Sequence, residues 1–437
     1  MDDPAQTPEH RSLLRRAVAA AAIGNMTEWY DFGVYAYVAD YVGAAFFPGP
    51  LQTLSAFGVF AVSFLLRPLG SLFFGPLGDR IGRQRVLAVT ILLMATSTFV
   101  LGLLPSYHQI GVLAPVLLLL CRMLQGFSTG GEYGGAATYI AEFAPADRRG
   151  FYGSWLEFGT LSGFGIGAAV PTALILNLDG AAMSEWGWRV PFLVAGPLGA
   201  IGLYLRRKLE DTPAFRDLQD KQALARSPLK ALVVEHWKPL LLLMGVVVTI
   251  NVANYELLTY LPEYLKETLQ VPATTALLPI IGMVVLMLAL ITPVGRLSDR
   301  VGRKPVFASA CVCLIVLSYP AFLLISQGTV LTTLAGLALL GVSHVQLLGP
   351  LAATLPAMFP TKVRYAAFCI GYNISTAVFG GTAPSVNQGA VQLTGDAFFP
   401  AYYLIAAAAI GLVPVLLMRE TAGKSMAERA PAAEPVS

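Results

Sequence analysis

The sequence predicts an all-α membrane protein with twelve transmembrane helices, arranged as two six-helix bundles related by a pseudo-twofold axis. Three observations lead to this fold class. Of the 437 residues, 56% are hydrophobic and only 13% are charged, whereas a soluble domain carries about 25% charged residues. Apolar runs of about twenty residues, long enough to cross a hydrocarbon core of about 30 Å, recur along the chain. One short motif also occurs twice, six predicted helices apart.

The predicted helices follow one another between short polar segments, of which only the middle one is long. Their spans are 15–38, 54–77, 86–104, 112–143, 150–176, 188–205, 239–262, 275–295, 305–326, 330–358, 364–390 and 400–418. The predicted domains are an N-terminal bundle at 1–205, a charged cytoplasmic linker at 206–238, a C-terminal bundle at 239–420 and a tail at 421–437. The tail is rich in Ala, Pro and Glu, so we expect it to be disordered and cytoplasmic.

Lys and Arg gather in alternate loops. Arg80 and Arg83 follow the second predicted helix, and Arg300 and Arg303 follow the eighth, while the intervening loops hold almost none. The positive-inside rule places the basic loops, and with them both termini, in the cytoplasm. The first apolar run carries acidic residues and lacks the pattern of a cleavable signal peptide. We therefore expect a multi-pass protein of the inner membrane.

Composition excludes several classes of function. The net charge of +3 comes with no basic face, so no nucleic-acid partner is expected. The four histidines are scattered and the four cysteines lack metal-ligand spacing, so we predict no metal site. No nucleophile with an adjacent base is evident, and no catalytic residue is assigned. The chain is therefore not expected to be an enzyme.

The repeated motif reads G-P-L-G-D-R-I-G-R-Q-R at 75–85 and G-R-L-S-D-R-V-G-R-K at 295–304. Its glycines permit a tight turn, and its aspartate and arginines can bridge neighbouring helix ends. A single copy is weak evidence, because any short cytoplasmic loop collects Arg and Gly. Two copies at equivalent places indicate a parallel repeat of two six-helix halves.

These motifs carry a resemblance. The repeated segment resembles the G-x-x-x-D-R-x-G-R-[RK] loop signature of the major facilitator superfamily, with Gln84 as a mild departure, and R-M-L-Q-G at 122–126 is similar to its R-x-x-Q-G motif. Four further segments resemble the metabolite:proton symporter family, over a match that runs from about 15 to 421. They are G-N-M-T-E-W-Y-D-F-G at 24–33, L-R-P-L-G at 66–70, Q-G-F-S-T-G-G-E-Y at 125–133 and L-P-A-M-F-P-T at 355–361.

The resemblance implies secondary active transport by alternating access. We expect proton-coupled uptake of a small zwitterionic or anionic metabolite, a compatible solute of the proline or glycine betaine type. Relatives in this family also carry dicarboxylates, citrate or shikimate, so an organic acid is the alternative, and efflux by antiport is a further one. The partners implied are the substrate, protons and the lipid bilayer. A monomer that needs no cofactor beyond the proton gradient is expected.

Two acids on the first predicted helix are candidates for proton coupling. Glu28 and Asp31 are i, i+3 neighbours and share one helix face. Two close carboxylates in a dry cavity raise each other's proton affinity, so the pair can load and release a proton. Alternatively, one of them pairs statically with Arg67 or Arg122 and only holds helices together.

Further ionisable groups lie inside other predicted helices. Arg122 stays charged and needs an anion, either a substrate carboxylate or one of the acids Glu28, Asp31 and Glu132. Glu132 lies ten residues on, about 15 Å along the axis, and is expected to be a coupling or gate residue. His344 is either part of a proton relay or a hydrogen-bonded helix contact.

Substrate contacts are expected from the first and seventh predicted helices. Aromatic faces attract quaternary ammonium groups, and the seventh helix is unusually polar. The candidates are Asn25, Trp29, Tyr30, Arg122, Asn251, Tyr255 and Glu256. Asn251 and Tyr255 are i, i+4 and can point inward together, while Glu256 departs from the apolar residue that the family resemblance implies. The alternative is that the aromatic residues pack between helices or belt the membrane interface.

A cytoplasmic gate is expected at the repeated loops. Its candidates are Asp79, Arg80, Arg83, Glu142, Arg149, Asp299, Arg300 and Arg303. Acids and arginines at adjoining helix ends can form charge networks that latch one state of the transport cycle. The alternative is a set of exposed surface pairs, which contribute little energy.

Overall fold

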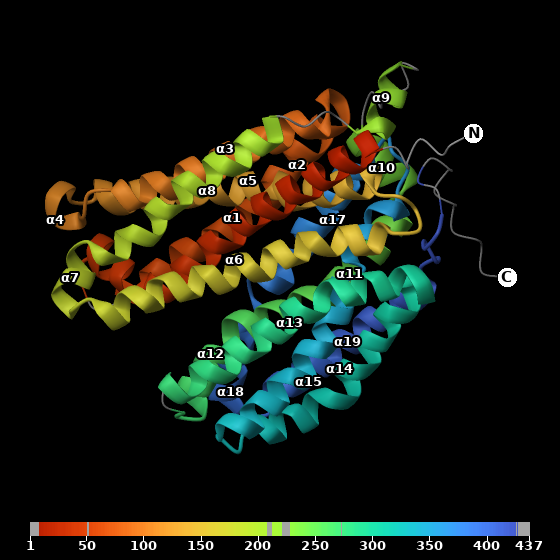
Figure 1. Ribbon diagram of the computed structural model, residues 1–437. Helices are drawn as coiled ribbons and strands as arrows, with labels where there is room; N and C mark the ends of the chain where they lie inside the picture. The colour runs from red at the N-terminus through yellow and green to blue at the C-terminus, as the bar shows by residue number, and fades with distance from the viewer. Residues whose placement is uncertain are drawn as a thin grey trace. The chain divides into compact units, whose positions relative to one another are not determined.

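The structure is a computed structural model that describes residues 8–49, 52–207, 212–220, 228–271, 273–424 and 426. Over these residues the chain is built of helices and their connections, and no β-strand occurs among them (Figure 1). The middle of the predicted linker, at 208–211 and 221–227, lies outside the described residues. The predicted tail is described only to 424 and at 426.

The helices fall into two compact units. Unit 1 comprises Met1–Phe143 and Phe158–Pro228, and unit 2 comprises Ala144–Glu157 and Leu229–Ser437. The helices up to the linker are α1 (Pro8–Phe46), α2 (Gln52–Ile81), α3 (Arg83–Leu103), α4 (Tyr107–Ile110), α5 (Leu113–Phe143), α6 (Arg149–Asn177), α7 (Gly180–Glu185), η2 (Gly187–Arg189), α8 (Val190–Arg207) and α9 (Pro213–Asp220). In unit 1, α5 packs against α2 and α3, and α3 packs against α8 (Figure 1).

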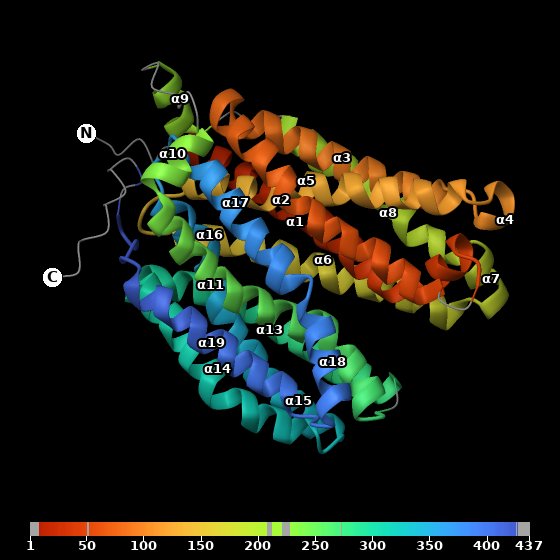
Figure 2. The same cartoon turned by 180° about the vertical axis from the view of Figure 1, so that it is seen from behind.

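The second half of the chain is interrupted more often. Its helices are α10 (Pro228–Glu235), α11 (Trp237–Tyr255), η3 (Glu256–Tyr260), α12 (Leu261–Glu263), η4 (Tyr264–Thr268), α13 (Ala273–Val301), α14 (Arg303–Ile325), α15 (Val330–Leu348), α16 (Leu351–Thr354), η5 (Pro356–Met358), α17 (Arg364–Ser375), η6 (Thr376–Gly380), α18 (Ala383–Thr394) and α19 (Phe399–Leu417). In unit 2, α14 packs against α15 and α19, and α11 packs against α19 (Figure 2).

The described residues contain ten helices that are long and apolar enough to cross a membrane by length and composition. The other two predicted spans lie in α1 and in the stretch from α17 to α18, which are helical but more polar. In α1, Glu28, Asp31 and Asp40 interrupt the apolar run. The second stretch is divided by π-helical η6 and a turn at Gly381 and Thr382. The first departure thus comes from acidic residues, which are costly in lipid and therefore mark functional candidates, and the second comes from the break in the helix.

Residues 144–157 depart from the predicted division of the chain. The sequence places them in the first bundle, whereas they pack within unit 2. The backbone N–H groups of Gly150 and Phe151 donate to the Asp299 carboxylate at 2.7 and 2.8 Å. The first N–H groups of a helix have no partner within the helix, so a carboxylate satisfies them well. Sequence alone does not show which acid occupies that position.

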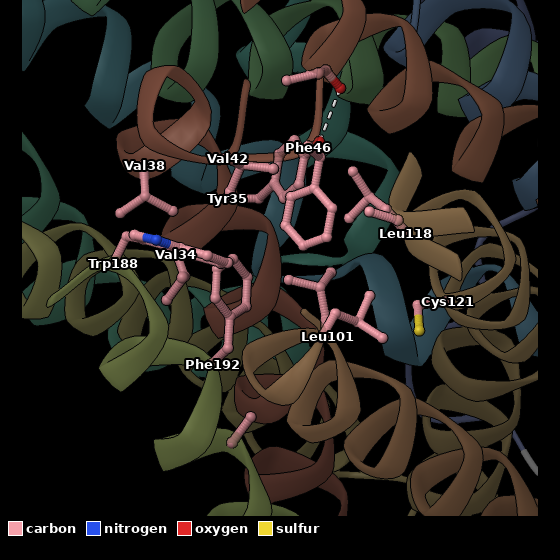
Figure 3. Packing of buried hydrophobic residues seen from close by; sticks show 14 of the residues in the cluster. Val34, Tyr35, Val38, Val42, Phe46, Leu101, Leu118, Cys121, Trp188 and Phe192 are labelled. Atoms are coloured by element: carbon pink, nitrogen blue, oxygen red, sulfur yellow. Dashed lines mark hydrogen bonds between the residues drawn. The ribbon is translucent and has the colours of Figure 1, made fainter. Parts of the chain in front are cut away.

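An apolar core cluster of unit 1 lies among α1, α3, α5, η2 and α8 (Figure 3). Trp188 contacts Phe46 edge to face, with ring centroids 5.7 Å apart, and Phe192 contacts Tyr35 in the same way at 6.5 Å. The Tyr35 hydroxyl donates to the Ala56 carbonyl at 2.8 Å. This packing surrounds the part of α1 that begins one turn beyond Asp31.

The sequence repeat has the same local geometry in both units. Gly82 separates α2 from α3 with φ of 106°, and Gly302 separates α13 from α14 with φ of 100°. Residues with a Cβ atom rarely adopt this region, so glycine is required at the turn. The aspartate of each copy pairs with the arginine four residues later, at 3.2 Å in unit 1 and 3.5 Å in unit 2.

Candidate functional site

The central polar contact of unit 1 joins α1 to α5. The Nη1 of Arg122 lies 2.7 Å from Oδ2 of Asp31, and both side chains are buried. Gln125, one turn further along α5, donates from Nε2 to Oδ1 of Asp31 at 3.1 Å and to the Thr98 hydroxyl at 2.7 Å. The guanidinium also lies over the Tyr35 ring, 3.8 Å from its centroid. Of the anions considered for Arg122, the structure therefore brings Asp31 into contact with it.

Helix α2, which carries Arg67, packs closely against α5, which carries Arg122. A Cβ atom at Gly126 would lie 2.1 Å from the Ser63 carbonyl oxygen, and one at Gly130 would lie 2.4 Å from the Arg67 carbonyl oxygen. Real Cβ atoms do not approach backbone so closely, so these glycines allow the two helices to touch. The motif that begins at Arg122 thus sets both the charge and the helix contact.

The second acid of α1 has an arginine of its own. Oε1 of Glu28 lies 3.7 Å from Nη2 of Arg67, and both side chains are 1% exposed. The Arg67 guanidinium is also 4.7 Å from the Phe32 ring centroid and 4.8 Å from that of Phe64. The structure thus assigns the two acids of α1 to different arginines. Pairing with Arg67 or Arg122 is the alternative that sequence analysis considered for these acids, and their role in proton coupling stays a prediction.

Glu132 is buried near the opposite end of the same bundle. Its Oε1 lies 2.9 Å from Nη2 of Arg206, whose Nη1 donates to the Leu87 carbonyl at 2.5 Å. Gly24 on α1 leaves room for this guanidinium, because a Cβ atom there would lie 2.0 Å from Nη2. Sequence analysis assigned Arg206 to the linker, whereas α8 continues to Arg207. Sequence alone offered no signal for this pairing.

The predicted substrate residues of α1 have different surroundings. Asn25 donates from Nδ2 to the Thr160 hydroxyl. Trp29 is 4% exposed and lies beside Phe32, with ring centroids 5.8 Å apart. The Tyr30 hydroxyl donates to the Pro191 carbonyl at 2.8 Å, within the apolar core. Tyr30 is therefore committed to helix packing, the alternative that sequence analysis considered for these aromatic residues.

Two predicted substrate residues of unit 2 lie together against one glycine. A Cβ atom at Gly380 would be 2.5 Å from Cε2 of Tyr255 and 3.3 Å from Oδ1 of Asn251. Asn251 also donates to the Val247 carbonyl at 3.0 Å. The glycine ends η6, a π-helical turn. Such turns are rare in proteins, and those that occur often lie at functional sites. The expected shared face of Asn251 and Tyr255 is present.

The other polar groups of this region are buried. Asn387 donates from Nδ2 to Oε2 of Glu256 at 3.0 Å. Nε2 of His344 lies 3.1 Å from Oδ1 of Asn254. His344 is therefore a hydrogen-bonded helix contact, one of the two roles that sequence analysis considered for it. No sequence motif pointed to Asn387.

The gate candidates of unit 1 form a compact charge cluster. Nη2 of Arg83 lies 3.2 Å from Oδ1 of Asp79 and 3.3 Å from Oε1 of Glu142. The Thr212 hydroxyl donates to Oε2 of Glu142, and the Phe215 ring lies 4.8 Å below the Arg83 guanidinium. Thr212 immediately precedes α9, and Phe215 lies on α9. The cluster therefore contacts the segment of chain that follows α8. Arg80, the other candidate here, is exposed.

The gate candidates of unit 2 surround the end of α19. Nη1 of Arg303 donates to both the carbonyl and the hydroxyl oxygen of Thr421 at 3.1 Å. Nη1 of Arg149 donates to the Lys424 carbonyl at 3.1 Å. Asp299 accepts from the first turn of α6, as described above. Arg300 is exposed.

Glu420 caps the helix that follows the second copy of the motif. Its carboxylate accepts the N–H groups of Arg303 and Lys304 at 3.1 and 3.0 Å, and those of Thr421 and Ala422 at 2.8 Å. Burial alone raises the pKa of this carboxyl. The four backbone donors outweigh burial and hold the pKa of Glu420 below its ordinary value. Sequence analysis did not single out this residue.

Among the described residues no group of His, Cys, Asp and Glu has the arrangement of a metal site. The candidate site of unit 1 is instead a set of buried acids, each paired with an arginine. Arg122 and Asp31 stabilise each other in this arrangement, because each charged group alone is costly to bury.

Comparison with known proteins gives the chain its family. A model of the Major Facilitator Superfamily matches residues 21–384. The Proline/betaine transporter of Salmonella typhimurium is 46% identical over 97% of this chain and 87% of its own length. The Glycine betaine/proline/ectoine/pipecolic acid transporter of Dickeya dadantii is 45% identical over the same shares. The Ectoine/proline transporter of Corynebacterium glutamicum is 43% identical, over 97% of this chain and 88% of its own length.

Solved structures agree on the fold. The proton:xylose symporter bound to 6-bromo-6-deoxy-D-glucose superposes with a TM-score of 0.80 at 18% identity, covering 96% of this chain and 98% of that chain. At this identity the likeness establishes the fold alone. It confirms the predicted twelve-helix architecture.

Proposed function

Because the chain belongs to the major facilitator superfamily, we propose that it takes up a zwitterionic compatible solute of the proline or glycine betaine type together with protons. The observation that carries this proposal is the identity of 43 to 46%, over 97% of the chain, to transporters named for proline, betaine and ectoine. The chain is a multi-pass membrane transporter and not an enzyme. Dicarboxylates, citrate and shikimate are the less favoured cargo.

The proposed cargo matches the charges of unit 1. A compatible solute of this type carries a carboxylate and an ammonium group. Two guanidinium nitrogens of Arg122, Nε and Nη2, have no hydrogen-bond partner, although the group is fully buried. A planar guanidinium binds a carboxylate through two parallel N–H groups. Arg122 is therefore proposed to bind the cargo carboxylate, and the ring of Trp29 to attract its ammonium.

Coupling follows from the shared arginine. A buried guanidinium is costly without an anion, so Arg122 needs either ionised Asp31 or the cargo carboxylate. When a proton neutralises Asp31, Arg122 becomes available to the cargo. When the cargo leaves, Asp31 must lose its proton to pair with Arg122 again. Proton and cargo are thus bound together and released together, which is symport.

The remaining predicted residues are proposed to assist. Glu28 and Glu132, each held by an arginine, adjust the charge balance of unit 1 during the cycle. Asn251 and Tyr255, against Gly380, are the proposed cargo contacts of unit 2. The repeated loops are the proposed cytoplasmic gate. We further propose a monomer in the inner membrane, with both termini in the cytoplasm and no cofactor.

Counterflow in proteoliposomes tests the cargo directly. Vesicles preloaded with one unlabelled compound are diluted into the labelled form of proline, glycine betaine, ectoine, 2-oxoglutarate, citrate or shikimate. We expect transient accumulation of the first three and none of the organic acids. Collapse of an imposed pH gradient should abolish net uptake while leaving counterflow intact. Accumulation of an organic acid alone would replace the proposed cargo.

A further inference from the structure

A buried acid in unit 2, Glu256, differs from the acids of unit 1 that pair with arginines. Glu256 is the first residue of η3, and its side chain is 0% exposed. Its Oε2 accepts one hydrogen bond, from Nδ2 of Asn387 at 3.0 Å, and its Oε1 has no hydrogen-bond partner. Over the described part of the chain, no Lys, Arg or His pairs with it. The ion pairs of Asp31 and Glu132 in unit 1 show what Glu256 lacks.

An ionised carboxylate in these surroundings is strongly disfavoured. Removing a charge from water is costly unless an opposite charge and several hydrogen bonds replace the water. One amide N–H is a weak replacement. A neutral carboxylic acid loses far less on burial, so the surroundings of Glu256 favour its protonated form.

The partner of Glu256 suits a group that gains and loses a proton. An arginine only donates and therefore stabilises the ionised acid alone. The Asn387 amide carries donors on Nδ2 and an acceptor on Oδ1, and this Oδ1 has no hydrogen-bond partner. With Nδ2 toward Glu256, the amide donates to a carboxylate. After half a turn, Oδ1 accepts the proton of the acid, so Asn387 serves both states.

The described elements around Glu256 present phenols and amides to it, while Lys266 on η4 is exposed and pairs with Glu267 at 3.0 Å. Tyr260 on η3, Tyr264 on η4 and Tyr403 on α19 are the titratable groups within electrostatic reach of the carboxyl. Glu263 on α12 is exposed. On α15, which also packs against η3, the titratable group His344 bonds to Asn254. None of these groups neutralises a Glu256 carboxylate.

The backbone marks the same position. The N–H of Leu261 donates to the Glu256 carbonyl, which is the i to i+5 bond of a π-helical turn. Such turns are rare and occur frequently at functional sites. Together with the missing cation, the two-way amide and complete burial, this turn distinguishes Glu256 from a structural acid.

We propose that Glu256 is a second proton-binding site of this transporter, separate from Asp31 and served by Asn387. The step is the formation of one O–H bond between the carboxylate and a proton delivered by water, and its reversal on release. This role replaces the cargo contact expected for Glu256 from sequence. The proposal rests on proton-coupled transport, and it predicts one more proton per cargo molecule than the Asp31 site alone supplies.

The first test detects the proton without transport. Infrared difference spectra across a pH jump are recorded for the purified full-length protein and for Glu256→Gln. We expect a carboxylic acid C=O band from a buried group in the wild type, absent from Glu256→Gln and retained in Glu263→Gln, the control at an exposed carboxyl of the same region. An identical band in Glu256→Gln would overturn the proposal. If that variant fails to fold, Asn387→Ala should shift the band, and an unshifted band would overturn it.

The second test counts protons. Reversal potentials at imposed pH gradients give the proton-to-cargo ratio in proteoliposomes with labelled proline or glycine betaine. The ratio should fall by one proton in Glu256→Gln and remain unchanged in Glu263→Gln. An unchanged ratio in a variant that still transports would overturn the proposal. Failure of wild-type counterflow with both compounds would instead reject the proposed cargo, and the infrared result would stand independently.

Discussion

At the scale of single residues, the proposed function depends on charges that have more than one possible partner. Arg122 holds Asp31 at 2.7 Å while two of its nitrogens have no hydrogen-bond partner. The 3.7 Å separation of Glu28 from Arg67 is longer than a direct hydrogen bond. Removing one member of a buried pair leaves the other uncompensated, at a cost of about 3–5 kcal/mol. In the proposed cycle, exchange of partners avoids that cost only when proton and cargo arrive together.

Asp31→Asn should uncouple transport from protons. The amide has nearly the size of the acid but carries no charge, so Arg122 is permanently available to a carboxylate. We expect counterflow of proline or betaine to persist and accumulation driven by a pH gradient to disappear. Asp40→Asn, at an exposed acid of the same helix, is the matched control and should accumulate normally. Full accumulation by Asp31→Asn would reject the coupling role.

Arg122→Lys should fail although it keeps the positive charge. A lysine has neither the planar fork that binds a carboxylate nor the flat face that lies over Tyr35. Loss of one cation–π contact costs about 0.5–2 kcal/mol, and about 1.4 kcal/mol corresponds to tenfold in rate. We expect initial uptake to fall about tenfold, with Arg16→Lys, an exposed arginine on α1, as control. Near-normal uptake would show that Arg122 is only a helix contact.

At the scale of elements, hydrophobic runs predicted the helices. They did not predict the π-helical turns or the partners of the buried charges. The predicted start of the fourth span at 112 lies one residue before α5 begins, because apolar length sets a transmembrane helix. The π-helical turns η3, η4 and η6 were not predicted, since they depend on tertiary contacts rather than on periodicity. Arg122 and Asp31 were identified as candidates because charge is costly in lipid. Their pairing, and that of Glu132 with Arg206, required the crossing of helices.

Gly126→Ala should separate α2 from α5. The added Cβ would meet the Ser63 carbonyl oxygen at 2.1 Å, and backbone has little room to move away. Overpacking of this kind costs about 1–3 kcal/mol. We expect a lower unfolding temperature of the purified protein and reduced transport. Gly389→Ala, where a Cβ meets nothing within 4 Å, is the control and should unfold no earlier than the wild type.

At the scale of the whole molecule, the sequence repeat is a repeat of structure. In both units the motif arginine contacts the chain that leaves the last long helix of that unit. Arg83 lies over Phe215, which follows α8, and Arg303 bonds to Thr421, which follows α19. The repeat was visible in sequence because both turns require glycine. The segments held by the two arginines were not, because their sequences differ.

Those differences give the second copy a dependence on pH. Glu420 accepts hydrogen bonds from four backbone N–H groups when its carboxylate is ionised. These donors lower the pKa of Glu420 in the folded protein. A carboxyl with a lowered folded pKa contributes stability above its unfolded pKa of about 4.3. That contribution is lost as pH falls through the folded pKa, because the protonated acid accepts fewer and weaker bonds.

The unfolding temperature of the purified protein, followed from pH 7 to pH 3, should therefore separate the wild type from Glu420→Gln. At pH 7 the variant should unfold earlier, since a neutral amide cannot replace a carboxylate that accepts four N–H groups. The difference should shrink on acidification below the unfolded pKa and vanish once Glu420 is protonated in the folded state. Glu185→Gln, at an exposed acid on α7, controls for the general loss of negative charge. A difference that stays constant down to pH 3 would show that Glu420 acts through its shape and not through its charge.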